Sequence, residues 1–218
     1  MNKYQKYIEE NLVKMVHSGV SLEGAIATRL QTQQVILHGS SDVSYKTAKI
    51  IKNILEGWRY ILSPNLGEPL NPLVLCNLHY GLSEGVADYL KEEDYRGRFR
   101  DFPISIGGSS YVPPVYSHDV AKKRLNLLFS TFDGSLDSVM IIYCYLMKYQ
   151  FFANTNKRTA FLWVNSCLYR YDLGFLLKLP TSERGRKSFT NHLLKFYENE
   201  SYLSSFVSYL KTYYLVKV

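Results

Sequence analysis

Cysteine, proline and glycine are all scarce in this sequence. Its 218 residues include 3 cysteines, 7 prolines and 13 glycines. Because Cys76, Cys144 and Cys167 are far apart and odd in number, they do not provide the framework of a disulfide-rich secreted fold, and we expect reduced thiols in a core. A chain of this length buries a sufficient core without disulfide or metal staples. The composition therefore predicts an ordinary globular protein with no structural metal.

Long apolar runs are also missing. The longest covers residues 139–147 and ends at Lys148, which is shorter than the roughly 20 residues that a membrane-spanning helix needs. Residues 1–10 are polar and lack the apolar segment of a secretory signal. We therefore expect a cytoplasmic protein with no membrane partner.

Positive charge exceeds negative charge, with 26 lysines and arginines against 19 acidic residues and a formal net charge of +7. This balance favours a phosphate-bearing partner, whether a nucleotide, a nucleic acid or an anionic membrane. Two basic clusters would suit nucleic acid, but no helix-turn-helix or other reader motif accompanies them. Such clusters are usually solvated faces, so nucleic acid is not the partner that we expect. The clusters are Arg96, Arg98 and Arg100, and Lys122, Lys123 and Arg124.

Helical periodicity dominates the chain. An apolar stripe at every fourth residue from Tyr4 to Val16 predicts a first helix. A second is expected over residues 21–37, ending at Gly39, and a third after a cap at Ser41 or Asp42. Further helices are expected from Asn71-Pro72 towards residue 84, through residues 136–147, over residues 157–171, and twice within residues 182–214.

Residues 97–114 break this pattern. They alternate and are rich in turn residues, with Ile104 and Ile106 on one face and a double glycine behind them. We interpret this segment as a β-hairpin. The fold class expected is thus one mainly α domain with a small β-hairpin.

Residues 150–160, QFFANTNKRTA, are the most informative stretch. They join two apolar helices, and the second helix starts with Lys157 and Arg158. Cations at a helix N-terminus cost about 0.3–1 kcal/mol each when exposed, and a bound anion would reverse that sign. The backbone N–H groups of residues 154–156, with these two cations, would form a phosphate cradle. Alternatively, this is a capped helix whose cations face water.

These residues resemble the signature of the Fic/Doc family, H-x-F-x-(D/E)-G-N-x-R-x-x-R. Phe152, Asn156 and Arg158 fall on the family's Phe, Asn and first Arg, and residues 157–160 match the K-R-T-A of the Doc-like ending N-K-R-T-A. A second block, residues 97–109 followed by Pro113-Pro114, resembles the family's flap, the hairpin that grips a target protein by strand addition. A third, weaker block is residues 19–24, which resemble the inhibitory helix motif with Glu23 as the inhibitory residue.

The resemblance implies a Fic-type helical bundle with a small β-hairpin flap, as one domain over residues 1–218. It would place N-terminal helices at 1–40, the Fic core at 70–172 and C-terminal helices at 175–218. It also implies AMP transfer from ATP to a hydroxyl of a target protein. The implied phosphate-binding residues are Asn154, Thr155, Asn156, Lys157 and Arg158, and the implied target-binding residues are Ile104, Ser105, Ile106 and Gly107.

The sequence departs from this family at four signature positions. Gln150 stands at the position of the family's general base, a His, and losing a positioned base typically costs roughly 10²–10⁴-fold in rate. Asn154 replaces the acidic Mg²⁺ ligand, so we expect at most a weak Mg²⁺ site. Thr155 replaces a glycine, and Phe161 replaces the second Arg, which in the family holds the γ-phosphate and pairs with the inhibitory Glu.

Three functions follow from these observations. The first is a transferase of AMP, or of phosphate in the manner of a Doc-like protein kinase, that uses an unusual base. The second is a catalytically silent relative that binds a purine nucleotide or a partner protein, and the third is a basic nucleic-acid binder. We expect a degenerate Fic-type site with impaired AMP transfer, with ATP and Mg²⁺ as the cofactors that the family would use.

Overall fold

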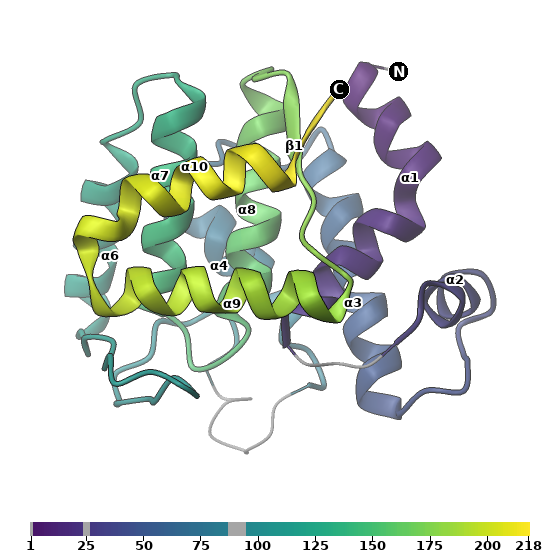
Figure 1. The fold of residues 1–218 in the computed structure, drawn as a ribbon, viewed down its shortest axis with the longest axis horizontal. Helices are drawn as coiled ribbons and strands as arrows, with labels where there is room; N and C mark the ends of the chain where they lie inside the picture. The colour runs from purple at the N-terminus through teal and green to yellow at the C-terminus, as the bar shows by residue number, and fades with distance from the viewer. Residues whose placement is uncertain (1, 24–26, 87–94) are drawn as a thin grey trace.

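The computed structural model describes residues 2–23, 27–86 and 95–218, and within these ranges the chain is mainly helical, as the sequence predicts (Figure 1). The first part contains α1 (Lys3–Val20), the 3₁₀ turn η1 (Ser21–Glu23), α2 (Arg29–His38), α3 (Tyr45–Leu62) and α4 (Pro72–Leu82). The second part contains α6 (His118–Phe129), α7 (Leu136–Tyr149), α8 (Asn156–Arg170), α9 (Glu183–Glu198), η2 (Glu200–Tyr202) and α10 (Leu203–Tyr214).

Helix α8 forms the centre of the fold. It packs against α7, α4 and α3. Most of its side chains are buried, because apolar or small residues occupy all of its faces. In Figure 1, α9 and α10 cross in front of α7 and α8. This crossing places α9 beside the turn that joins α7 to α8, where the cavity described below is found.

The start of α4 confirms the prediction from Asn71-Pro72. The Asn71 side chain caps the helix by accepting the N–H of Leu73 at 2.9 Å, and Pro72 takes the first helical position. Proline is tolerated there because the N–H that it lacks has no partner within the helix.

Two other helix starts differ from the sequence prediction. Helix α2 begins at Arg29 rather than at residue 21, because Thr28 caps it and the residues of η1 form a separate 3₁₀ turn. Helix α3 is capped by Ser44 rather than by Ser41 or Asp42. Ser21 and Thr28 both precede α2, and Ser41, Asp42 and Ser44 all precede α3. The sequence does not choose among such suitable caps.

The β-hairpin expected over residues 97–114 is not formed: within the described residues 95–117 no strand is present. Three prolines, Pro103, Pro113 and Pro114, lie in this segment and remove donors that a strand ladder would need. A turn at residues 106–109 remains, closed by the Ser109 N–H donating to the Ile106 carbonyl at 3.2 Å. We call residues 98–114 the rim loop.

The small sheet lies elsewhere. Strand β1 (Phe175–Leu177) pairs antiparallel with β2 (Leu215–Lys217) at the C-terminal end of the chain. The side chain of Asn165, on α8, accepts the Leu177 N–H at 2.8 Å and donates to its carbonyl at 3.2 Å, which fixes β1 against the central helix. Among the described helices, none combines the length and apolarity that a membrane crossing requires.

Candidate functional site

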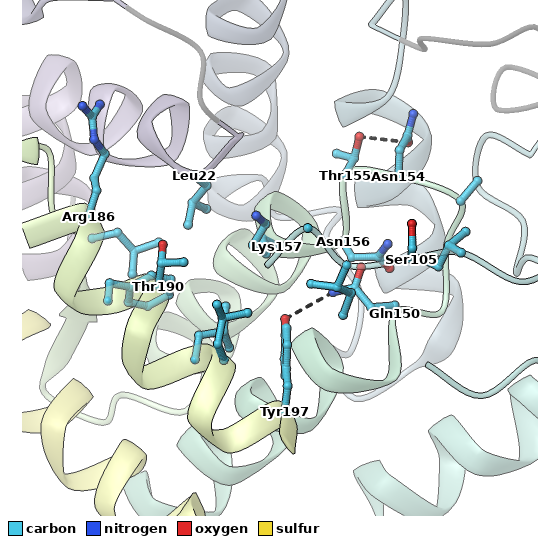
Figure 2. Close-up of a pocket in the computed structure, with 18 of the residues that line it drawn as sticks. Leu22, Ser105, Gln150, Asn154, Thr155, Asn156, Lys157, Arg186, Thr190 and Tyr197 are labelled. Carbon is cyan, nitrogen blue, oxygen red and sulfur yellow. Dashed lines mark hydrogen bonds between the residues drawn. The ribbon is translucent and has the colours of Figure 1, made fainter. Parts of the chain in front are cut away.

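A cavity of about 590 Å³ lies where five segments meet (Figure 2). Its walls are the rim loop at residues 102–107, the turn between α7 and α8, the start of η1, residues 179–180 ahead of α9, and one face of α9. Ligand sites typically have volumes of about 300–1,000 Å³. The cavity therefore has room for a small molecule, and it brings together segments that are more than a hundred residues apart in the chain.

The turn between α7 and α8 is fixed by the side chain of Asn156. Its Oδ1 accepts the Phe152 N–H at 2.9 Å, and its Nδ2 donates to the Phe152 carbonyl at 2.8 Å. Two residues of this turn have left-handed backbones, Gln150 at φ 49° and Thr155 at φ 57°. A β-branched residue rarely adopts this conformation, so Thr155 is held there against its own preference.

Helix α8 begins without a side-chain cap. Thr155 is its N-cap residue, but its hydroxyl donates to Asn154 Oδ1 at 3.0 Å and accepts from Arg158 Nη2 at 3.1 Å, rather than capping the first turn. The first N–H groups of a helix carry a partial positive charge and have no partner within the helix. Lys157 adds its own charge beside them at the cavity wall. This end of the cavity is therefore suited to an anion.

Gln150 is held by the end of α7. Its Nε2 donates to the Met147 carbonyl at 2.5 Å and to the Tyr197 hydroxyl at 3.3 Å, and that hydroxyl also donates to the Met147 carbonyl at 2.9 Å. Figure 2 shows Tyr197 rising from α9 towards Gln150. The carboxamide thus serves to close the C-terminal end of a helix, and it has no nitrogen lone pair with which to accept a proton.

Arg100 connects the rim loop to the turn, a role that no pattern in the sequence predicts. Only 2% of the residue is exposed. Its guanidinium donates to the carbonyls of Gln150 at 2.7 Å, Phe102 at 2.6 Å and Pro114 at 2.9 Å, while its backbone N–H donates to the Phe151 carbonyl at 2.9 Å. The expectation that residues 96–100 form a solvated basic face is therefore wrong at Arg100.

His79 lies beneath the turn, stacked on Phe152 with the ring centroids 4.0 Å apart. Its Nδ1 accepts the Gly97 N–H at 3.0 Å, so the neutral ring carries its proton on Nε2. Burial, together with the nearby charges of Arg158 and Arg96, lowers the pKa of His79 to about 3. A nitrogen of such low basicity is a poor general base at neutral pH. His79 therefore does not substitute for the histidine that the Fic signature has at position 150.

Because His79 is buried, we expect the protein to lose stability in acid. Because the pKa of His79 lies below its ordinary value of 6.5, the unfolded chain binds more protons between these two values, and the free energy of unfolding falls as the pH falls through that window. By pH 4 the loss is about 3 kcal/mol. In urea unfolding between pH 7 and pH 4, the free energy of unfolding should depend less on pH for His79→Gln than for the wild type. The exposed His38 provides the matched control, and a His38→Gln slope equal to that of His79→Gln would contradict the assignment.

No protein-family model matches the sequence, and no curated protein matches it. Solved structures do match. A Fic-domain-containing signalling protein from Bacteroides thetaiotaomicron superposes on 96% of this chain with a TM-score of 0.75 and 18% sequence identity. This chain has the Fic fold. The match covers 85% of the Bacteroides chain.

Two further Fic proteins superpose over most of the chain. Fic-1 from C. elegans matches with a TM-score of 0.71 and 15% identity, covering 97% of this chain and 62% of the worm chain. The BepC protein of Bartonella tribocorum, solved with bound AMPPNP, matches with a TM-score of 0.55 and 12% identity over 90% of this chain and 91% of that one. The chain thus spans less than two thirds of the Fic-1 chain, and at these identities the likeness concerns the fold.

The Fic fold gathers most of the residues singled out from the sequence around one cavity. The two groups at its wall are Gln150, Asn154, Thr155, Asn156 and Lys157, and Ile104, Ser105, Ile106 and Gly107. Arg158 is not at the wall: it is buried behind the turn, where it supports Thr155. Glu23 ends η1, directly after the cavity residues Ser21 and Leu22, but its side chain lies outside the described part of the structure.

The wall of the cavity that α9 forms was not predicted from the sequence. Arg186 and Tyr197 both lie on this helix and reach the cavity. The distance along the chain between α8 and α9 hides this proximity. Phe161, at the position of the signature's second Arg, instead packs in the core with its ring edge-on to Trp58, at a centroid distance of 5.9 Å.

The cavity residues do not fit Mg²⁺. None of the described residues at the wall is acidic. Within the described ranges, no group of three or more His, Cys, Asp and Glu side chains is placed to hold a metal ion. Mg²⁺ prefers carboxylate and phosphate oxygens in near-octahedral geometry, and the carboxamide oxygen of Asn154 already accepts the Thr155 hydroxyl.

Proposed function

We propose that this protein binds a purine nucleotide in the cavity and is impaired in transferring AMP to a target. The observation that carries the proposal is the state of Gln150. It occupies the position of the family's general base, yet it is a carboxamide whose Nε2 donates to the Met147 carbonyl and the Tyr197 hydroxyl. A group that accepts no proton at neutral pH cannot assist attack by a hydroxyl.

The nucleotide part of the proposal is supported by the anion-suited end of the cavity. The uncapped start of α8 and the side chain of Lys157 would both face a phosphate bound there. The Fic fold accommodates a nucleotide in BepC, which contains AMPPNP. A cavity of about 590 Å³ is large enough for such a ligand.

The backbone of the rim loop is suited to contact with a protein partner. Residues 103–105 form part of the cavity wall, and their backbone makes no hydrogen bond to any other described residue. Backbone groups without such partners can pair with a strand of another chain without regard to its sequence. We therefore propose a target or regulatory partner that contacts Ile104, Ser105, Ile106 and Gly107.

The same loss of the base counts against a Doc-like kinase, because that activity also begins with a hydroxyl attacking a phosphate. The remaining choice is between slow transfer and binding alone. We further propose a cytoplasmic location, because Cys76, Cys144 and Cys167 are all free thiols, and burial raises the pKa of each. Protonated, buried thiols of this kind suit a reducing compartment.

Calorimetry and a transfer assay test the proposal together. ADP and ATP should bind the wild type, and Lys157→Ala should weaken ADP binding by about tenfold. The exposed Lys187, on α9 and away from the cavity wall, gives the matched control Lys187→Ala, which should bind as the wild type does. Incubation with labelled ATP and cell lysate should leave proteins unlabelled. Strong labelling by the wild type, or no nucleotide binding at all, would overturn the proposal.

A further inference from the structure

The metal position of the Fic signature has lost its function as a metal ligand. Asn154 is neutral, and its Oδ1 accepts the Thr155 hydroxyl at 3.0 Å, so the side chain is already engaged within the turn. No carboxylate from the described cavity wall stands in for it. Among the described residues, a nucleotide bound in this cavity would therefore meet none of the anionic oxygens that hold its Mg²⁺ in a metal-dependent site.

Two cations lie at the cavity wall instead. Lys157 comes from the first turn of α8 and Arg186 from the first turn of α9. Among the side chains that the structure describes, those of residues 2–22, 27–86 and 95–218, neither makes an ion pair or a side-chain hydrogen bond. Their positive charge is thus not neutralised by any carboxylate within those ranges.

The two cations occupy different parts of the cavity. Figure 2 shows Lys157 near its middle and Arg186, beside Leu22, at the end away from Gln150. The Arg186 charge lies near His17 of α1, and burial together with this charge lowers the pKa of His17. The signature's own second Arg is absent, because residue 161 is a phenylalanine packed against Trp58 in the core. The second cation of this cavity comes from α9 rather than from α8.

We propose that the cavity binds the phosphate chain of a nucleotide as the metal-free anion, with Lys157 and Arg186 supplying the positive charge that Mg²⁺ brings elsewhere. This inference rests on the proposed function. Free ADP carries more negative charge than its Mg²⁺ complex, and the attraction between charges scales with their product. A wall with two cations and no described carboxylate favours the free form, and Mg²⁺ competes with the protein for the same phosphate oxygens.

Calorimetry with ADP tests this inference at physiological ionic strength. The titration is run once with a chelator that removes divalent cations and once with excess Mg²⁺. We expect ADP to bind in the chelator, and its apparent Kd to rise by about threefold or more when Mg²⁺ is added. Arg186→Gln should weaken ADP binding in the chelator by about fivefold or more. Arg184→Gln, an exposed charge removed from the same helix outside the cavity wall, is the matched control and should leave the Kd unchanged.

The outcomes separate this inference from the proposed function. Binding that is tightened by Mg²⁺ would overturn the metal-free inference and leave nucleotide binding intact. Equal effects of Arg186→Gln and Arg184→Gln would remove Arg186 from the inference, since net charge alone would then account for the change. No binding of ADP under either condition would instead overturn the proposed function. Thermal unfolding of each variant without ligand establishes that all of them fold.

Discussion

A triple variant carrying Gln150→His, Asn154→Asp and Thr155→Gly should transfer AMP from ATP and Mg²⁺ about 100-fold faster than the wild type, or more. The histidine supplies a proton acceptor at the end of α7, where residue 150 already lines the cavity. The backbone of residue 150 is left-handed, with φ at 49°, and histidine tolerates this conformation better than most residues do. The aspartate supplies a hard oxygen for Mg²⁺.

The third change, Thr155→Gly, removes a side chain that would hinder the other two. At φ 57°, position 155 has a backbone that glycine adopts freely. The Thr155 hydroxyl also engages the oxygen of residue 154, which the new aspartate needs for its metal. Phe161 is left unchanged, because an arginine placed beside Trp58 in the core would be a buried, unpaired charge.

The measurement is labelling of lysate proteins with labelled ATP, at equal concentrations of folded protein. The matched control carries the same changes at 154 and 155 but Gln150→Asn, which keeps a carboxamide of nearly the same length as the ring. Equal labelling by the histidine and asparagine variants would show that the missing base does not limit transfer. Equal labelling by the wild type and the triple variant would show that the native site is not impaired.

Replacing Arg100 with methionine should lower the free energy of unfolding by about 3–5 kcal/mol. The methionine keeps most of the apolar stem but removes the donors that satisfy the carbonyls of Gln150, Phe102 and Pro114. Buried acceptors left without donors each cost about 1–3 kcal/mol. The free energy of unfolding of Arg100→Lys should lie between those of the wild type and Arg100→Met, because one ammonium group cannot reproduce the planar fork that reaches all three oxygens.

Denaturant unfolding measures this effect, with Arg98→Met as the matched control. Arg98 is exposed, and removing its charge should change stability by no more than about 0.5 kcal/mol. ADP binding gives a second readout at a temperature where all variants are folded. Since Arg100 holds the turn in place, Arg100→Met should also weaken ADP binding. Equal stabilities of the two methionine variants would contradict the role assigned to Arg100.

Local sequence signals predicted some of the parts of the fold that depend on local chemistry, but not the caps of α2 and α3 or the backbone of the rim loop. The Asn71-Pro72 pair marks the start of α4, and the polar stretch before Lys157 marks the turn into α8. Residues that resemble the Fic signature do meet at a cavity. In each case the deciding interactions lie within a few residues of one another, so the pattern is legible in the sequence.

Long-range contacts account for what the sequence did not reveal. Arg100 reads as one of three alternating arginines, and only the fold brings the carbonyl of Gln150 to it across fifty positions. Strands β1 and β2 are each three residues long, and their pairing joins the two ends of the C-terminal part of the chain. Arg186 is similarly unremarkable until α9 crosses the cavity. Such placements depend on tertiary packing and leave no local pattern.

The bonds of one arginine also have a thermodynamic consequence. Arg100 contacts two separate points of the rim loop, at Phe102 and Pro114, and the carbonyl of Gln150 in the turn. A protein that grips the loop and a small molecule that sits against the turn therefore act on the same rigid junction. If either one repositions that junction, each must alter the affinity of the other by an equal factor. In that case a partner protein at the rim loop would respond to whether the cavity is occupied, and no reaction would be needed.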